Sequence, residues 1–139
     1  MSGFVLDASV ALRWFLDHPV HAYANRVKRL ILKGVRAVVP ALWHLEMSNG
    51  LIVAERRSIL TSADVDQAVR DIEQIVVQAV DTDSRIVSAR QTLETARAFQ
   101  LSAYDAVYLD LARRERLPLA TLDDRLRGAA ARAGVAAVC

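Results

Sequence analysis

Residues 102–126, SAYDAVYLDLARRERLPLATLDDRL, contain the pattern of a helix, a short strand and a second helix in direct succession. Ser102 is suited to cap a helix over residues 103–112, and Pro118 cannot continue that helix. Leu119–Thr121 is a short apolar run typical of a buried strand, and the acidic residues after it open the next helix. An apolar strand between two helices is typical of a parallel sheet, so this segment predicts an α/β fold.

The rest of the chain repeats this alternation of short apolar strands and helices. The other expected strands cover residues 4–6, 35–39, 76–80 and 135–138. The other expected helices cover residues 10–16, 21–33, 40–57, 61–74 and, capped by Asp83 or Ser84, 85–99. This pattern predicts a short central parallel sheet flanked by helices on both faces. The sequence contains no internal repeat or linker, so we expect one domain over residues 1–139.

The composition of the 139-residue chain is that of a globular protein. Hydrophobic residues make up 53% and charged residues 24%, which excludes an intrinsically disordered chain. No apolar run approaches the roughly 20 residues of a transmembrane helix, and the N-terminus does not have the pattern of a signal peptide. Cys139 is the only cysteine, which excludes a disulfide framework and a thiolate metal site. We therefore expect a cytoplasmic protein without membrane contact.

Asp105 is unusual because it interrupts an otherwise apolar helix. Residues 103–112 are apolar except for Asp105 and Asp110. A buried carboxylate without a partner is costly, or else it keeps its proton. The chain supplies acids rather than bases nearby, and carboxylates that converge require a cation between them. Asp105 therefore indicates a cation site shared with other acids.

Three further acids are expected at one edge of the sheet. Asp7 closes the first strand, Asp123 follows the strand at 119–121, and Glu46 lies early in the helix that begins at Pro40. In parallel sheets the functional site lies beyond the carboxyl ends of the strands. No histidine or cysteine cluster accompanies these acids, and oxygen ligands favour Mg²⁺ or Mn²⁺ over Zn²⁺. Several acids around such an ion are typical of enzymes that cleave phosphodiesters.

Four short motifs contain these acids: V-L-D-A-S at 5–9, V-P-A-L-W-H-L-E at 39–46, S-A-Y-D-A at 102–106 and L-A-T-L-D at 119–123. In order and spacing they resemble the PIN-domain ribonucleases, and the chain looks like the VapC-type toxin of a VapBC type II toxin–antitoxin pair. The resemblance extends from Phe4 to Arg127. It implies a PIN-domain fold and an endoribonuclease that depends on Mg²⁺ or Mn²⁺ and cleaves RNA with a metal-activated water.

The same resemblance implies partners and site residues. The partners are an RNA substrate, a small antitoxin from the same operon that prevents growth inhibition, and a second copy in a homodimer. The catalytic and metal-binding acids of the family correspond by position to Asp7, Glu46, Asp105 and Asp123. Ser9 and Thr121 match hydroxyl positions that often line the pocket. Asn49 lies one turn from Glu46 and either holds a water or a ligand carboxylate or packs between helices.

Arginine dominates the basic residues, because only Lys28 and Lys33 are lysines among the 18 Lys and Arg residues. Arginine suits bidentate phosphate contacts, although a GC-rich genome also favours it. Candidates for contacts with RNA phosphates flank two of the acids: Arg113, Arg114, Arg116, Arg125 and Arg127. Ordinary helix-surface charge explains these arginines equally well, and a net charge of +2 gives no strong basic field.

Other acids have simpler explanations than a metal site. Asp124 lies about 100° around the helix from Asp123, so only one of the two is expected to point inward, and the motif spacing favours Asp123. Asp110 lies about 140° from Asp105, and we expect it in solvent or in an ion pair with the arginines that follow it. Turn and cap positions explain the acids after the third strand, Asp81 and Asp83.

Two other functions are compatible with the motifs. One is a PIN-like module that binds RNA or protein without catalysis, which the loss of one or more acids would indicate; here all four acids are present. The other is a housekeeping nuclease that processes RNA or DNA, which the lack of an adjacent antitoxin gene would indicate. The sequence does not identify the RNA that is cleaved.

Overall fold

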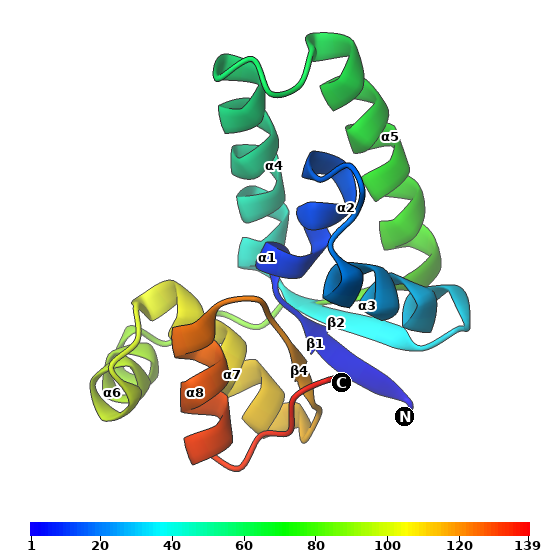
Figure 1. Cartoon of the computed structure of the whole chain (residues 1–139). Helices are drawn as coiled ribbons and strands as arrows, with labels where there is room; N and C mark the ends of the chain where they lie inside the picture. The colour runs from blue at the N-terminus through cyan, green and yellow to red at the C-terminus, as the bar shows by residue number, and fades with distance from the viewer.

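Four short strands form a parallel sheet at the centre of the computed structural model, which describes residues 1–139 (Figure 1). The strands are β1 (Gly3–Leu6), β2 (Arg36–Pro40), β3 (Val80–Asp83) and β4 (Leu119–Ala120). Their order across the sheet is β3-β2-β1-β4, and every neighbouring pair is parallel. The chain therefore has the α/β fold that the alternation of strands and helices predicts.

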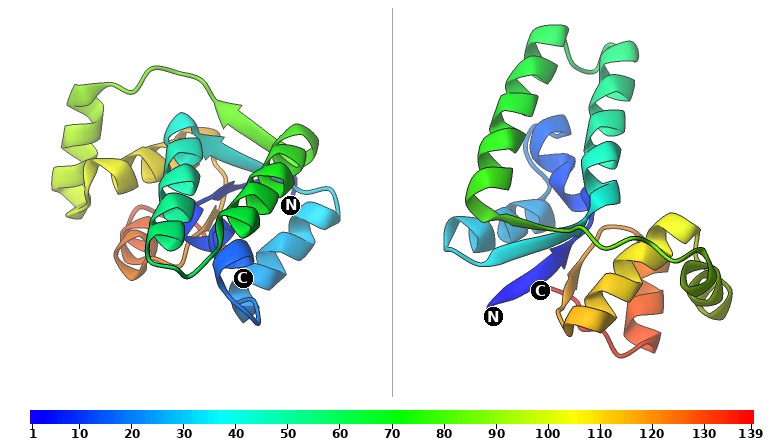
Figure 2. Two further views of the ribbon diagram at one scale, coloured as in Figure 1. Left: turned by 90° about the horizontal axis from the view of Figure 1, so that it is seen from above. Right: turned by 180° about the vertical axis from the view of Figure 1, so that it is seen from behind.

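Helices cover both faces of this sheet in two groups that follow the chain order (Figures 1 and 2). The first group comprises α1 (Ala8–Ala11), α2 (Arg13–Leu16), α3 (Ala22–Leu32), α4 (Ala41–Arg56) and α5 (Ser62–Ala79). The second group, on the opposite face, comprises α6 (Ala89–Phe99), α7 (Ala103–Glu115) and α8 (Asp124–Arg132). α4 and α5 form a pair that projects beyond the sheet (Figure 1). None of these helices is long and apolar enough to cross a membrane.

The strand β1 is buried from both sides and lies at the centre of the hydrophobic core. Its residues Phe4, Val5 and Leu6 have no exposed surface. A continuous apolar run, rather than an alternation of apolar and polar residues, suits a parallel strand that helices cover on both faces. Tyr108 of α7 and Trp43 of α4 pack into the same core from the two helical layers. This packing fixes the ends of β1, α4 and α7 relative to one another.

The third strand lies later in the chain than the sequence predicts. The expectation of a strand at 76–80 is wrong, because α5 continues through Ala79 and β3 begins only at Val80. Ile72 and Val76 lie one helical turn apart, and both pack against the core. The β-branched residues of this segment favour a strand locally, but the packing of a helical face outweighs that preference.

Two other boundaries also differ from the sequence predictions. α6 begins after Ser88, whose hydroxyl accepts a backbone N–H of the first turn at 3.3 Å, so neither Asp83 nor Ser84 caps it. The strand expected at 135–138 is reduced to a single bridge between Ala137 and β4. A longer ladder does not form there because β4 itself has only two residues.

Candidate functional site

One pocket at the carboxyl edge of the sheet contains the four acids that the motifs indicate. Asp7 follows β1 and Asp123 follows β4, while Glu46 lies in the second turn of α4 and Asp105 in the first turn of α7. Parallel strands end at the same edge, and α4, α7 and α8 begin there. The pocket is open to solvent and has a volume of about 610 Å³, and all four carboxylates line it.

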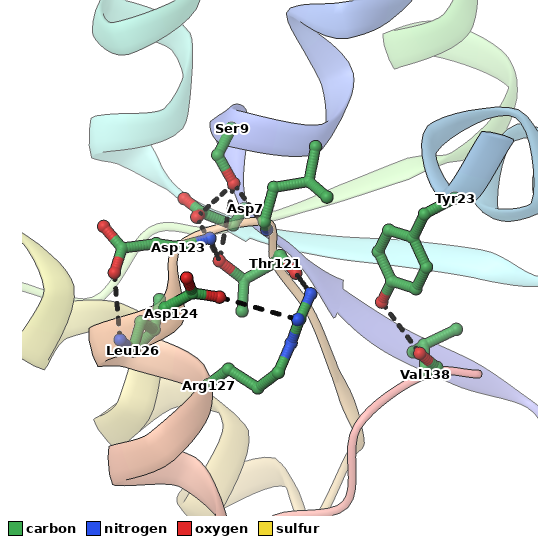
Figure 3. A network of polar contacts seen from close by, with 10 residues as sticks. Asp7, Ser9, Tyr23, Thr121, Asp123, Asp124, Leu126, Arg127 and Val138 are labelled. Carbon is green, nitrogen blue, oxygen red and sulfur yellow. Dashed lines mark hydrogen bonds and ion pairs between the residues drawn. The ribbon is translucent and has the colours of Figure 1, made fainter. Parts of the chain in front are cut away.

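Asp7 is the most buried of these acids, with 5% of its surface exposed. Its Oδ2 accepts hydrogen bonds from Ser9 Oγ and Thr121 Oγ1, each at 2.7 Å (Figure 3). Burial raises the pKa of Asp7, the hydroxyl hydrogen bonds lower it, and the charge of Asp123 raises it. The net shift of this pKa is upward, so the neutral donors do not fully compensate for desolvation.

The hydroxyls of Ser9 and Thr121 also position the loop between β4 and α8. Thr121 Oγ1 accepts the N–H of Asp123 at 3.0 Å, and Ser9 Oγ accepts the N–H of Leu122 at 3.0 Å. The two hydroxyl oxygens lie 3.4 Å apart (Figure 3). This network connects Asp7 at the end of β1 to Asp123 at the start of α8. It fixes the distance between two acids that are far apart in the sequence.

Glu46 is held by Tyr108 of α7, a residue that the motifs do not single out. Tyr108 Oη donates a hydrogen bond to Glu46 Oε1 at 2.6 Å. Burial raises the pKa of Glu46, the Tyr108 hydrogen bond lowers it, and the charges of Asp7 and Asp105 raise it again. Tyr108 lies three residues after Asp105 and hence on the same face of the helix, which is the sequence signal that could have indicated it.

Asp105 and Asp123 each lie at the N-terminus of a helix. Ser102 caps α7 by accepting the N–H of Asp105 at 3.1 Å, and Asp123 caps α8 because its Oδ1 accepts the N–H of Leu126 at 3.0 Å. Burial raises the pKa of Asp105, and the charges of Asp123 and Asp7 raise it further. The carboxylates therefore lie close enough together to repel one another electrostatically.

The pocket has the donor chemistry of a Mg²⁺ or Mn²⁺ site. None of the four carboxylates takes part in an ion pair with a basic side chain. No three His, Cys, Asp or Glu side chains are close enough together to surround one ion directly. Mg²⁺ normally binds only one or two carboxylates and otherwise keeps waters or phosphate oxygens, so a wider spacing suits a hydrated ion. The oxygen ligands fit such an ion, which could contact different acids directly or through water.

A family comparison agrees with this arrangement. The profile of the PIN domain family matches residues 4–132. The chain belongs to the PIN domain family. Members of this family are typically nucleases and commonly depend on a metal ion.

Two solved structures share the PIN fold of this chain. PAE2754 from Pyrobaculum aerophilum is 19% identical, with a TM-score of 0.69 over 91% of this chain and 84% of that one. FitAcB from Neisseria gonorrhoeae is 20% identical, with a TM-score of 0.69 over 98% of this chain and 96% of that one. No curated protein matches the sequence significantly. At these identities the structural likeness establishes the fold alone.

The rest of the pocket in this PIN domain combines an amide with apolar side chains. Asn49 lines the wall one turn after Glu46. A Cβ at Gly50 would lie 2.5 Å from a methyl carbon of Leu12, so this glycine makes room for the leucine side chain. The other apolar members of the lining are Ala8, Leu42, Leu45 and Tyr104. The pocket thus places a group of acids beside a partly apolar wall.

Two further acids of the PIN domain lie outside the pocket. The Asp124 side chain is 96% exposed and lies 3.8 Å from Arg127, so Asp123 rather than Asp124 faces the other acids, as the motif spacing predicts. The prediction that the Asp110 side chain lies in solvent or in an ion pair is wrong. Asp110 is half-buried, and its Oδ1 accepts a hydrogen bond from Thr95 Oγ1 of α6 at 2.7 Å. Burial raises the pKa of Asp110.

The arginines expected to contact RNA form two groups in the PIN domain. Arg125 and Arg127 are exposed on α8, within two turns of Asp123. Arg127 Nη2 also donates to the carbonyl oxygen of Thr121 at 2.6 Å, beside the acids (Figure 3). The second group lies at the C-terminal end of α7, roughly 12 Å or more along the helix from its first turn, and comprises Arg113, Arg114 and Arg116. Only the first group lies beside the acids.

Proposed function

We propose that this PIN domain is a Mg²⁺- or Mn²⁺-dependent endoribonuclease that acts as the toxin of a toxin–antitoxin pair. The observation that best supports the nuclease is the convergence of four carboxylates, without a basic partner, in one pocket open to solvent. Holding these charges together is unfavourable unless a cation neutralises them. A cation at such a place would favour phosphodiester hydrolysis, because the phosphate and the leaving oxygen are negatively charged.

The chain's own residues have distinct tasks in this proposal. The residues that would bind the ion or ions are Asp7, Glu46, Asp105 and Asp123. Ser9 and Thr121 hold one oxygen of Asp7 in a fixed orientation, and Asn49 would hold a water or the substrate. When bound, the metal would activate a water for attack on phosphorus and neutralise the leaving oxygen. No histidine lines the pocket, so no side chain of that type is available there as a general base.

Arginines next to the acids would hold the RNA backbone. Arg125 and Arg127 are exposed on the helix that begins at Asp123, so a phosphate near the pocket lies within reach of their side chains. The arginines at the far end of α7 would contact only more distant nucleotides. Arg114 also neutralises Asp83, so it is less available for RNA than the α8 pair.

A cleavage assay with purified protein tests the nuclease directly. We expect RNA cleavage with millimolar Mn²⁺, its loss in EDTA, and its recovery when Mn²⁺ is restored. Asp105→Asn should remain folded and bind RNA, but should not cleave it. RNA binding without metal-dependent cleavage by the wild type would support a non-catalytic module instead.

The toxin assignment is supported by the resemblance of the four acidic motifs to VapC-type toxins. It predicts that expression of the chain alone inhibits growth and that co-expression of a small adjacent gene restores it. The two products should purify as a stable complex with suppressed nuclease activity, and the chain alone as a homodimer. A wild-type nuclease without toxicity, and without such a neighbouring gene, would support a housekeeping role in RNA or DNA processing.

A further inference from the structure

The hydroxyl of Tyr108 lies where three segments of the acid pocket meet. Tyr108 is fully buried in α7, and its Oη donates to Glu46 Oε1 of α4 at 2.6 Å. The same oxygen accepts the backbone N–H of Ala8, the residue after Asp7, at 3.4 Å. Asp105 lies one turn earlier on the same helix. One side chain thus connects the segments that contain three of the four acids.

The hydrogen bond from Tyr108 makes the two carboxylate oxygens of Glu46 inequivalent. Oε1 is occupied by the short hydrogen bond from Tyr108, whereas Oε2 has no hydrogen-bond partner within the chain. A glutamate side chain has three rotatable bonds, and ordering it has an entropic cost that a fixed donor reduces when a ligand binds. The carboxylate is therefore held before any ligand arrives, with one oxygen left for the pocket.

We propose that Tyr108 is a positioning residue that fixes Glu46 and sets its spacing from Asp7 and Asp105 for binding a divalent cation. The proposal rests on the metal-dependent function proposed above and adds one residue that does not itself contact the ion. Small ions such as Mg²⁺ require near-ideal octahedral geometry, so the orientation of each oxygen ligand affects affinity. Partners that orient metal ligands typically change metal affinity by about 10- to 100-fold when removed.

The test is the affinity of Tyr108→Phe for Mn²⁺, measured by titration calorimetry of the folded protein. The substitution removes only the hydroxyl, so we expect the dissociation constant for Mn²⁺ to rise about tenfold or more. Tyr23→Phe is the matched control, because the Tyr23 hydroxyl also makes a hydrogen bond within the fold, to the carbonyl oxygen of Val138 at 2.8 Å. Tyr23→Phe should bind Mn²⁺ like the wild type.

A double substitution separates positioning from a general loss of stability. If Tyr108 acts through Glu46, adding Tyr108→Phe to Glu46→Gln should weaken Mn²⁺ binding little beyond Glu46→Gln alone. A merely structural hydroxyl would lower the melting temperature of Tyr108→Phe and leave its Mn²⁺ affinity unchanged. A lower melting temperature with unchanged Mn²⁺ affinity would overturn the positioning role of Tyr108, but it would not contradict the metal-dependent nuclease. Absence of Mn²⁺ binding and of cleavage in the wild type would overturn the proposed function itself.

An NMR titration of the wild-type protein tests the role of Tyr108 if Tyr108→Phe does not fold. The chain has three tyrosines, so a protein labelled with ¹³C at the tyrosine ring carbon that bears the hydroxyl gives three resolvable signals. On titration with diamagnetic Mg²⁺, the Tyr108 signal should shift in parallel with occupancy of the metal site, and the Tyr23 signal should not. A Tyr108 signal that stays constant at saturation would contradict the proposal.

Discussion

Two acids at the ends of parallel strands in the same sheet, β3 and β1, differ in the partners that the fold gives them. Asp83 ends β3 and lies 2.9 Å from Arg85 and 2.7 Å from Arg114. Asp7 follows β1, and its two side-chain donors are neutral hydroxyls at 2.7 Å. Both carboxylates are largely covered by protein, with 16% of the Asp83 side chain and 5% of Asp7 exposed. The chain neutralises the first acid with its own cations and leaves the second without one.

This difference shows that a position at the end of a strand does not by itself indicate a functional acid. Asp81, also in β3, is paired with Arg36 at 2.6 Å and needs no ligand. A covered acid without a cationic partner is unfavourable in the folded state, and groups of this kind concentrate at functional sites. The absence of a basic partner, together with convergence, distinguishes the pocket of Asp7 from the arginine-paired acids of β3.

The largest expected contrast between the two regions is in catalysis. Asp105→Asn should reduce RNA cleavage by about 100-fold or more, because losing roughly 3 kcal/mol of transition-state stabilisation has that effect. The same result is expected for Asp7→Asn, Glu46→Gln and Asp123→Asn. Asp83→Asn should cleave at nearly the wild-type rate in the same initial-rate assay with Mn²⁺. Equal losses of cleavage rate in the pocket variants and in Asp83→Asn would contradict the distinction between the acid pocket and the arginine-paired acids of β3.

Metal binding should separate the regions by their thermal stability. A ligand at 100 times its dissociation constant stabilises the folded state by about 2.7 kcal/mol. Saturating Mn²⁺ should therefore raise the melting temperature of the wild type and of Asp83→Asn by several degrees, and that of Asp7→Asn much less. Scanning calorimetry with EDTA and with Mn²⁺ measures the effect. An equal metal shift in Asp7→Asn would place the ion elsewhere.

Without metal, the acid pocket should give a distinctive dependence of stability on pH. The pKa values of Asp7, Glu46 and Asp105 are raised in the folded state, chiefly by burial. The folded state therefore binds more protons than the unfolded state over the interval between the unfolded and folded pKa values. The free energy of unfolding should increase as the pH falls through the folded values, and this gain should stop below the unfolded values.

Removing one charge should reproduce part of this gain at neutral pH. Two unit charges about 6 Å apart repel by roughly 3 kcal/mol at an effective dielectric of 20, and solvent screening reduces this. Asp105→Asn should thus be more stable than the wild type by about 1 kcal/mol at pH 7 in EDTA. Asp83→Asn should be less stable by up to about 1 kcal/mol, because it breaks ion pairs. Urea unfolding that gives both variants the same sign would contradict this account.

Asp110→Asn should have the smallest effect. Asp110 is covered like the pocket acids, but it faces Thr95 of α6 and has no contact with the pocket. An asparagine oxygen can still accept that hydrogen bond, so we expect unfolding free energy within about 0.5 kcal/mol of wild type and unchanged cleavage. If this variant alone lost activity, the face of α7 that points toward the pocket would be assigned incorrectly.

The elements with local signals were predictable from the sequence. Ser102, Pro118 and the acids after Thr121 define α7, β4 and α8, because capping and chain breaking depend on neighbouring residues. The prediction of a strand at 76–80 is wrong because the structure of this segment depends on tertiary packing rather than on neighbouring residues. Its β-branched residues satisfy local strand preferences, but tertiary packing assigns them to the last turns of α5.

The same distinction applies to the pocket. The rule that acids gather beyond strand ends was enough to expect Asp7 and Asp123 in one place. It could not tell that Asp83 binds Arg114, which is 31 residues away, or that Tyr108 binds Glu46 across 62 residues. The spacing from Asp105 places Tyr108 on the same face of α7, but a tyrosine in an apolar helix is ordinarily a core residue, so only the folded structure shows that its hydroxyl binds Glu46.

Anomalous diffraction from crystals soaked in Mn²⁺ would locate the ion without any assay of activity. Data collected at the manganese absorption edge should show a peak within the pocket, beside the carboxylates of Asp7, Glu46, Asp105 and Asp123. The peak should be absent in crystals of Asp7→Asn and present in crystals of Asp83→Asn. A wild-type crystal with no peak in the pocket, or with its only peak beside Asp81 and Asp83, would contradict a shared metal site.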